Sequence, residues 1–241
     1  MLLSVICRLK DEKIPIDYRR KVVSFLKHAI SNDDSAFYDE LYENNVNKEF
    51  TFSVYFYPDT IIRQDYISVV SKKLAINFST PDPYICIKIY NALSKQRLTW
   101  FNISDDNAIH IVEIHNPKEK VITENRAIFK TLSPIVIRDH DPLTKKDWFY
   151  TFEDNESIDI LRRNLKHELK DKFPRDISKD IDDLKISFFD MKKTVVKSYE
   201  FLIPCSLGCV SLEGQQYLIQ YIYQRGLGSK RSLGFGMLKL I

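Results

Sequence analysis

The order of strand-like and helix-like segments repeats once along the chain, and this repeat constrains the fold more than any other feature of the sequence. In the first half, an apolar run is followed by a segment in which Val22, Leu26 and Ile30 recur at helical spacing. Two β-rich segments come next, then a helix opened by Pro81 and Pro83, and then an extended segment. The predicted strands are 2–9, 49–57, 72–80 and 108–116, and the predicted helices are 14–30, 33–43 and 81–96.

The second half shows the same order of segments. Its predicted strands are 131–139, 184–191, 193–203 and 235–241, and its predicted helices are 156–173 and 213–225. Two βαββαβ units in tandem predict an α+β fold of two ferredoxin-like domains, each with an antiparallel sheet and helices on one face. Polar residues at 118–125 interrupt the apolar pattern. We therefore expect an N-terminal domain of residues 1–123 and a C-terminal domain of residues 124–241.

Length and charge narrow the class of protein. The 241 residues are 44% hydrophobic, which is enough for a sizeable core. Lys and Arg outnumber Asp and Glu by only 36 to 33, so any nucleic-acid site must come from local clusters of positive charge. No basic N-terminal region and no membrane-length apolar run is present, so we expect a cytoplasmic protein without membrane contact. The cysteines lack metal-binding spacing and are expected to be buried thiols: Cys7, Cys86, Cys205 and Cys209.

Four of the six glycines lie in one short segment near the C-terminus, GLGSKRSLGFG at 226–236. Glycine tolerates positive φ and the close approach of another backbone, so the segment indicates a loop in close contact with a partner. Lys230 and Arg231 lie between the two Gly-x-Gly pairs, where they favour an anion such as phosphate. The spacing fits neither a P-loop nor a dinucleotide-binding loop, because the segment leads from a helix into a strand. A glycine-rich turn without a ligand is the alternative.

The glycine segment has the pattern G-h-G-x5-G-h-G, where h is hydrophobic and the central five residues include basic ones. This pattern, near the C-terminus of two tandem ferredoxin-like domains, resembles the Cas6 family of CRISPR RNA-processing endoribonucleases. Four further segments are similar to that family, so the resemblance spans most of the chain. They are YRRKVVSFLKHAI at 18–30, FYDELYE at 37–43, FTFSVYF at 50–56 and FKTLSPIVIRD at 129–139.

The resemblance implies metal-independent cleavage of CRISPR repeat RNA, which leaves a guide RNA with part of the repeat at its 5′ end. A ribose 2′-OH attacks the adjacent phosphate, the 5′-oxygen leaves, and a 2′,3′-cyclic phosphate remains. This reaction needs a base near the 2′-OH, an acid or a cation near the leaving oxygen, and positive charge beside the phosphorane. We therefore expect no metal, no cofactor, and repeat RNA or the processed guide RNA as the partner. Other CRISPR effector subunits and a second copy of the chain stay open as partners.

Three residues are candidates for the chemistry. Many family members place a histidine in the segment that corresponds to YDELYENNVNKEF, where this chain has Tyr42. Lys48 corresponds to a catalytic lysine of some members, although a lysine with an ordinary pKa near 10.4 is a poor base at neutral pH. His28 is the nearest histidine and is predicted to face outward, opposite the apolar stripe of its helix. The alternatives are a packing role for Tyr42, an ordinary loop position for Lys48 and a solvated surface position for His28.

Positive charge near the first helix and in the glycine segment supplies candidate RNA contacts. Arg19, Arg20 and Lys27 are expected to extend a phosphate track toward the glycine segment if the two domains face each other, or else to be solvated helix charges. Lys230 and Arg231 are predicted to contact RNA phosphates. Four glycines are predicted RNA-binding residues, Gly226, Gly228, Gly234 and Gly236, and of these Gly228 and Gly234 are predicted to let the backbone come close.

Three functions fit these observations. The first is a repeat-processing endoribonuclease, which the glycine segment and the repeated βαββαβ order favour. The second is a repeat-binding protein with weak or lost catalysis, which the tyrosine at position 42 favours. The third is a structural RNA-binding subunit of a CRISPR effector complex.

Overall fold

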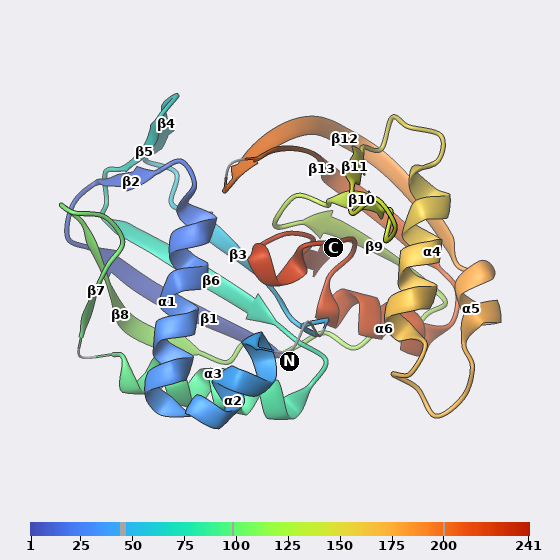
Figure 1. Ribbon diagram of the computed structural model, residues 1–241, viewed down its shortest axis with the longest axis horizontal. Coiled ribbons are helices and arrows are strands. Elements are labelled where there is room, and N and C mark those ends of the chain that lie inside the picture. The colour runs from blue at the N-terminus through green and yellow to red at the C-terminus, as the bar shows by residue number, and fades with distance from the viewer. Residues whose placement is uncertain (44–46, 98, 200) are drawn as a thin grey trace.

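The computed structural model describes residues 1–43, 47–97, 99–199 and 201–241, which form two α+β halves side by side (Figure 1). The α+β class predicted from the sequence is confirmed. The N-terminal half contains β1 (Leu2–Leu9), β2 (Lys13–Pro15), α1 (Tyr18–Asp33), α2 (Ser35–Tyr42), β3 (Thr51–Phe56), β4 (Thr60–Ile62), β5 (Tyr66–Val69), β6 (Lys73–Ser79), α3 (Pro83–Lys95), β7 (Trp100–Asn102) and β8 (Ala108–His115). The C-terminal half contains β9 (Arg126–Thr131), β10 (Ile137–His140), β11 (Asp147–Tyr150), α4 (Ser157–Leu169), α5 (Ser178–Asp182), β12 (Lys185–Ser198), β13 (Phe201–Glu213), α6 (Gln216–Arg225), a 3-10 turn at Arg231–Leu233 and β14 (Leu238–Leu240).

The N-terminal half is built on one antiparallel sheet in the order β3-β6-β1-β8-β7. β1 alternates in burial, with Leu3, Val5, Cys7 and Leu9 turned into the core. α1 and α3 pack against each other over one face of the sheet. β2, β5 and β4 form a separate small sheet beyond the start of α1, which the sequence analysis did not predict. No helix among the described residues combines the length and the apolar character needed to cross a membrane.

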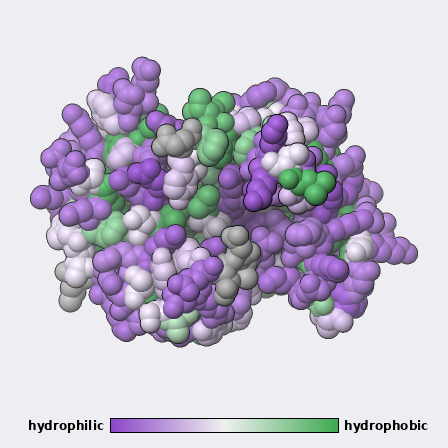
Figure 2. Space-filling view, in the orientation of Figure 1, coloured by the Kyte–Doolittle hydropathy of each residue, from purple (hydrophilic) through white to green (hydrophobic). Residues whose placement is uncertain are grey.

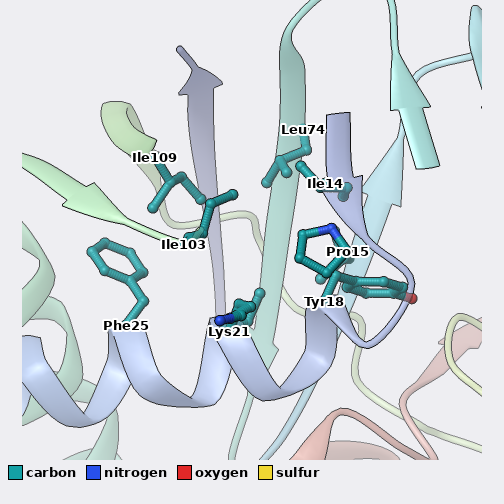
Figure 3. A pocket seen from close by; sticks show the side chains of 10 residues that line it. Ile14, Pro15, Tyr18, Lys21, Phe25, Leu74, Ile103 and Ile109 are labelled. Carbon is teal, nitrogen blue, oxygen red and sulfur yellow. The ribbon is translucent and has the colours of Figure 1, made fainter. Parts of the chain in front are cut away.

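The first turns of α1 pack closely on the sheet. Figure 3 shows Tyr18 and Phe25 on the helix, with Ile14, Leu74 and Ile109 on the strands that it covers. A cavity of about 20 Å³ remains among these side chains. It holds no more than one water-sized body, so this apolar gap belongs to the core.

The C-terminal half repeats the arrangement with the order β12-β13-β9-β14, also antiparallel. In both halves the first and third long strands of the unit lie adjacent at the centre of the sheet. α4 and α6 contribute buried residues to a second hydrophobic core. β12 and β13 are 14 and 13 residues long and form a hairpin whose distal end reaches over the junction between the halves (Figure 1).

The strand predicted at 131–139 is wrong. The first strand of the second half is β9, which ends at Thr131, and Pro134 lies in the segment that separates it from β10. β10 pairs with β11 in its own two-stranded sheet. Proline lacks an N–H group and removes a ladder hydrogen bond, so an apolar run that contains it is not a continuous central strand.

The strand pair predicted at 184–191 and 193–203 is also wrong. Both segments contribute to one long strand, β12, whose register with β13 shifts between Phe189 and Lys192. Asp190 in this bulge has φ 49°, which a strand pattern read from sequence does not anticipate. The true partner is β13, which includes Pro204 and Gly208, and α6 begins at Gln216 rather than at 213.

The glycine segment lies between the two halves and contacts both. Thr51 Oγ1 on β3 donates a hydrogen bond to the Phe235 carbonyl oxygen at 2.7 Å. The Cβ positions of Gly226 and Gly234 lie against Thr51 and against the ring of Phe52, respectively. The loop that follows α6 therefore packs directly on the N-terminal half.

Gly236→Ala is expected to destabilise the protein strongly. Gly236 has φ 72°, and an added Cβ would lie inside van der Waals contact with the Leu227 carbonyl, whose residue donates a 2.9 Å hydrogen bond to the Gly236 oxygen. Strain and the lost close contact should cost about 2 kcal/mol or more of unfolding free energy in urea denaturation.

Gly214→Ala is the matched control. Gly214 lacks a positive φ, and the nearest atoms to its Cβ position belong mainly to the Leu184 side chain, so a loss below about 1 kcal/mol is expected. Equal losses for the two variants would show that the close backbone contact at Gly236 does not stabilise the fold.

Candidate nucleic-acid interface

Two lysines converge on Tyr42 at the junction. Tyr42 is the last residue of α2, Lys27 lies on α1, and Lys48 precedes β3. The ammonium nitrogens of Lys27 and Lys48 lie 4.7 Å and 5.3 Å from the centre of the Tyr42 ring, within the range of cation–π contacts. The structure thus brings together two of the three predicted catalytic residues, together with one predicted RNA contact. We call these three side chains the lysine–tyrosine cluster.

The cluster alters the acidity of its members. Burial lowers the pKa of Lys48 below its ordinary value, and repulsion from Lys27 lowers it further. Burial raises the pKa of Tyr42, and the neighbouring Tyr38 and Tyr199 add to the rise. Tyr42 therefore stays protonated at neutral pH, whereas Lys48 gives up its proton more readily than an ordinary lysine. Tyr199 belongs to the β12–β13 hairpin, so a residue of the C-terminal half acts electrostatically on this cluster.

His28 does not join the lysine–tyrosine cluster. It is exposed, its Nε2 lies 3.0 Å from Asn32 Nδ2, and its ring centre lies 5.0 Å from that of Phe101. Phe101 is on β7, at the edge of the sheet opposite to β3. Because Lys48 leads into β3, a catalytic role for His28 beside it does not fit the geometry.

Arg19 and Arg20 take different positions. Arg19 Nε donates a 3.2 Å hydrogen bond to the Gly234 carbonyl oxygen, and its guanidinium lies 5.1 Å from the centre of the Phe235 ring. Arg19 therefore ties α1 to the glycine loop. Arg20 is exposed, and its guanidinium lies 5.9 Å from the Tyr199 ring centre. Of this pair, Arg20 presents the more accessible charge at the junction.

A buried ion cluster lies behind the glycine loop. Arg225, at the end of α6, is fully buried, and its Nε lies 3.1 Å from Glu49 Oε2 while its Nη2 lies 2.5 Å from Glu168 Oε2. Arg231 Nη1 lies 2.8 Å from the same Glu168 oxygen and donates to the Gly228 carbonyl at 2.7 Å. Two positive and two negative side chains from both halves thus compensate one another. We call these four residues the buried ion cluster.

Two predictions for the glycine segment need correction. Arg231 is only 5% exposed and is ion-paired inside the protein, so it does not present its charge to a phosphate. Gly226, Gly234 and Gly236 are buried, and the space beside the loop glycines is filled by the protein's own atoms. Gly228 faces the Val136 carbonyl in the same way. The expected close contact exists, but its partner is the protein itself.

Lys230 is the loop cation that keeps access to the surface. It is partly buried, has φ 57°, and its ammonium nitrogen lies 5.8 Å from the centre of the Phe149 ring. Burial lowers the pKa of Lys230, Arg138 lowers it further, and Asp147 opposes both effects. Among the described residues, Asp147 is thus the carboxylate that acts on Lys230.

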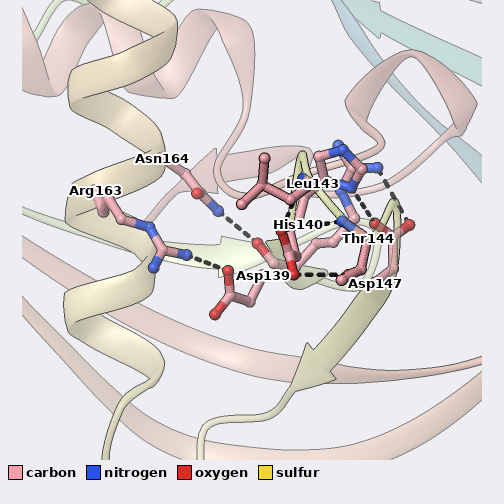
Figure 4. A network of polar contacts seen from close by, with 9 residues as sticks. Asp139, His140, Leu143, Thr144, Asp147, Arg163 and Asn164 are labelled. Carbon is pink, nitrogen blue, oxygen red and sulfur yellow. Dashed lines mark hydrogen bonds and ion pairs between the residues drawn. The ribbon is translucent and has the colours of Figure 1, made fainter.

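The turn between β10 and β11 carries a polar network beside a second groove. His140 Nδ1 lies 2.7 Å from Asp147 Oδ1, and Arg163 Nη2 lies 2.6 Å from Asp139 Oδ1; Figure 4 shows this network. His140 and Arg163 help to line a groove of about 300 Å³ that Asn47 reaches from the N-terminal half. Because His140 and Arg163 already contact carboxylates, this groove is a weaker anion site than the lysine–tyrosine cluster.

Exposed apolar side chains gather at the distal end of the β12–β13 hairpin. Phe201 and Leu202 are 68% and 70% exposed, and Figure 2 shows hydrophobic side chains over this end, above the junction. Within the described residues, no three His, Cys, Asp or Glu side chains form a group that could hold a metal.

The fold and the site define the class of the protein. It is an α+β protein of antiparallel sheets whose C-terminal glycine loop closes the junction between two halves, with cations and aromatic rings gathered there. The family described as CRISPR associated protein Cas6, C-terminal, matches residues 116–240. The chain belongs to the Cas6 family.

Individual relatives extend the similarity over the N-terminal half. A CRISPR-associated endoribonuclease-like Cas6 protein of Pyrococcus furiosus is 30% identical over 188 residues, which cover 75% of this chain and 73% of the relative. CRISPR-associated endoribonuclease Cas6 1 of Methanocaldococcus jannaschii is 25% identical over 231 residues, or 93% and 86% of the two chains. The solved structure of a Cas6-related gene product from Pyrococcus furiosus has a TM-score of 0.86 and 26% identity, with 100% and 98% of the two chains covered.

Sequence reasoning did not find the buried ion cluster. Glu49 was assigned to the start of a strand and Arg225 to the end of a helix, where a basic residue is ordinary. Glu168 offered one signal, because a carboxylate in the last turn of a helix opposes the helix dipole and requires a compensating cation.

Glu168→Gln is expected to lower the unfolding free energy by about 3–5 kcal/mol at pH 7, because it leaves two buried guanidinium groups with only Glu49 as a counter-charge. Burial raises the pKa of Glu168, but Arg231 and Arg225 outweigh burial and lower it overall. The stabilisation is therefore present above the ordinary pKa near 4.3 and is lost as pH falls through the lower folded pKa. Urea denaturation from pH 7 to pH 3 should show the two proteins converging.

Glu153→Gln is the control, because Glu153 pairs with Lys193 on the surface and its loss should cost less than about 1 kcal/mol. If Glu168→Gln lowered the unfolding free energy at pH 7 by no more than Glu153→Gln does, the buried ion cluster would not stabilise the protein.

Proposed function

We propose that the protein is a metal-independent endoribonuclease that cleaves CRISPR repeat RNA. The observation that carries the proposal is the lysine–tyrosine cluster at the junction, in a chain of the Cas6 family. Its two ammonium groups supply positive charge where a phosphorane would need it, and phosphoryl transfer depends largely on such preorganised charge. CRISPR repeat RNA is the proposed substrate, and the processed guide RNA is the proposed product.

The members of the cluster suit different parts of the reaction. The 2′-oxygen bonds to phosphorus as its proton passes to Lys48, whose lowered pKa makes its neutral form more available. The ammonium group of Lys27 stabilises the charge on the non-bridging oxygens. The bond to the 5′-oxygen breaks, and this oxygen takes a proton from the Tyr42 hydroxyl or from water. The products are a 2′,3′-cyclic phosphate and a free 5′-hydroxyl.

We also propose that residues 1–123 and 124–241 are two ferredoxin-like domains. The matching strand orders β3-β6-β1-β8 and β12-β13-β9-β14 support this division. The buried ion cluster, the Thr51–Phe235 hydrogen bond and the Arg19–Gly234 hydrogen bond join the two domains. The proposed cleavage site lies where these links fix one domain against the other.

A repeat-binding protein without cleavage is the second candidate. It is favoured by Tyr42, because a phenol whose pKa is raised by burial is a poor substitute for an imidazole. Tight binding of repeat RNA without product at any pH would support it. Tyr42→His is then the substitution with which to restore cleavage.

Lys48→Ala is expected to slow cleavage by about 100-fold or more while repeat RNA is bound within about threefold of the wild-type affinity, because a general base contributes to the transition state. The host's labelled repeat RNA is incubated with each protein in EDTA, beside the same RNA with a 2′-deoxy sugar at the mapped site. His28→Ala is the control and should cut within about twofold of the wild-type rate. Wild-type cleavage by Lys48→Ala would refute the assignment of the base.

Lys27→Met is expected to move the pH dependence of cleavage upward. The rate should rise with pH as Lys48 loses its proton, and removing the repulsion of Lys27 raises the pKa of Lys48, so the rise shifts to higher pH. Single-turnover rates between pH 6 and pH 10 measure the shift. Lys73→Met, an exposed lysine on β6, is the control, and an unchanged profile for Lys27→Met would contradict this role for Lys48.

A further inference from the structure

A pocket of about 350 Å³ lies between the distal end of the β12–β13 hairpin, the β10–β11 hairpin and the glycine loop. Three aromatic rings line it, those of Phe149, Tyr199 and Phe201. Two ammonium groups line it as well, those of Lys145 and Lys230. This combination of flat apolar rings and cations is the chemistry that binds unstacked bases and their phosphates.

The floor of the pocket is rigid. Ile203 lines the pocket and is buried in a small core with Val136, Cys205 and Phe235. Leu233, from the glycine loop, also lines the pocket and packs on the same core. A base that enters would rest on packed side chains, which keeps the cost of ordering the site low.

The backbone around the pocket is unusual. Five non-glycine residues among the described parts of the chain have positive φ, and three of them line this one pocket: Lys145 at 56°, Tyr199 at 55° and Lys230 at 57°. Side chains other than glycine disfavour this region, and such residues gather at binding sites where the surrounding structure holds them. Lys145 and Tyr199 lie at the turns of two hairpins, where positive φ is common, and these turns bring both side chains to the same pocket as Lys230.

We propose that this pocket binds one unstacked nucleotide of single-stranded RNA, with its base against the rings of Phe149 and Phe201 and its phosphate near Lys145 and Lys230. The inference rests on the proposed function for its choice of RNA and deepens it by naming a recognition site. Among the described lining residues the one carboxylate is that of Asp147, and it already contacts His140 and Arg138, so it does little to offset the charge of the two lysines.

Tyr199 relates the pocket to the lysine–tyrosine cluster. Tyr199 lines the pocket and is close enough to Tyr42 to raise its pKa, and the exposed Arg20 lies beside the Tyr199 ring. A nucleotide held in the pocket therefore places the neighbouring phosphates toward Lys27 and Lys48. Such placement fixes the position of cleavage along the strand rather than supplying the chemistry.

The test is a comparison of Phe201→Ala with Leu202→Ala. The two residues are adjacent and almost equally exposed, but successive side chains of a strand point to opposite faces, and only Phe201 lines the pocket. Fluorescence anisotropy in EDTA measures the binding of two probes: a 12-nucleotide oligoadenylate RNA, and the host's repeat RNA with a 2′-deoxy sugar at the cleavage site. Phe201→Ala should weaken binding of both by about 5- to 150-fold, and Leu202→Ala by less than twofold.

An abasic scan of the repeat RNA identifies the bound base. One abasic position should weaken binding to the wild-type protein by a similar factor, and the same position should have almost no effect in Phe201→Ala, since the two changes remove one contact. Equal affinities for Phe201→Ala and wild type, or no binding of either RNA, would overturn the proposal. The proposal would also be overturned if Phe201→Ala bound RNA normally but changed the mass of the protein in sedimentation, because the hairpin would then be a protein-docking surface. The cleavage assay with Lys48→Ala tests the proposed reaction, and the binding assay with Phe201→Ala tests the pocket. Either proposal can therefore fail without the other.

Discussion

The geometry of the junction depends on the buried ion cluster. Arg225 stands at the last residue of α6, where a cation complements the helix dipole, and the glycine loop begins at the next residue. Its two carboxylate partners come from different halves, Glu49 from the segment before β3 and Glu168 from the end of α4. Charges this deeply buried cost several kcal/mol each in desolvation, so they are tolerated only in an arrangement that keeps them paired. The cluster therefore disfavours other positions of one half against the other.

The same cluster sets where positive charge is available. Arg225 and Arg231 are neutralised by Glu49 and Glu168, so the two most deeply buried arginines of the junction contribute little to its external field. Lys48 immediately precedes Glu49, and the ion pair of Glu49 thus anchors the backbone that carries the proposed base. The accessible charge is left to side chains on the rim, namely the exposed Arg20 and the partly buried Lys27, Lys48 and Lys230. A chain with a net charge of only +3 obtains a local positive surface in this way.

Periodicity predicted what depends on local spacing. The helical stripe of Val22, Leu26 and Ile30 and the β-rich runs placed most elements, and the repeated order indicated two similar halves. Periodicity did not predict features that depend on contacts between residues far apart in the chain. Pro134 and the bulge at Asp190 changed the strand limits, because pairing partners rather than composition decide where a ladder continues. The local pattern predicts a surface cation at Arg231, because nothing local reveals Glu168, 63 residues away in the chain.

Two lysines on one tyrosine ring offer a physical route to acid–base chemistry in a site that lacks histidine. The ordinary pKa of histidine already lies near neutral pH, whereas the pKa of a lysine must fall by about three units before half of its molecules are neutral there. Burial and a second ammonium group act in that direction on Lys48, and the electron-rich face of Tyr42 holds both cations in place. The two lysines then have different roles in the reaction. The one that keeps its proton stabilises the transition-state charge, and its repulsion is what makes the second available as a base.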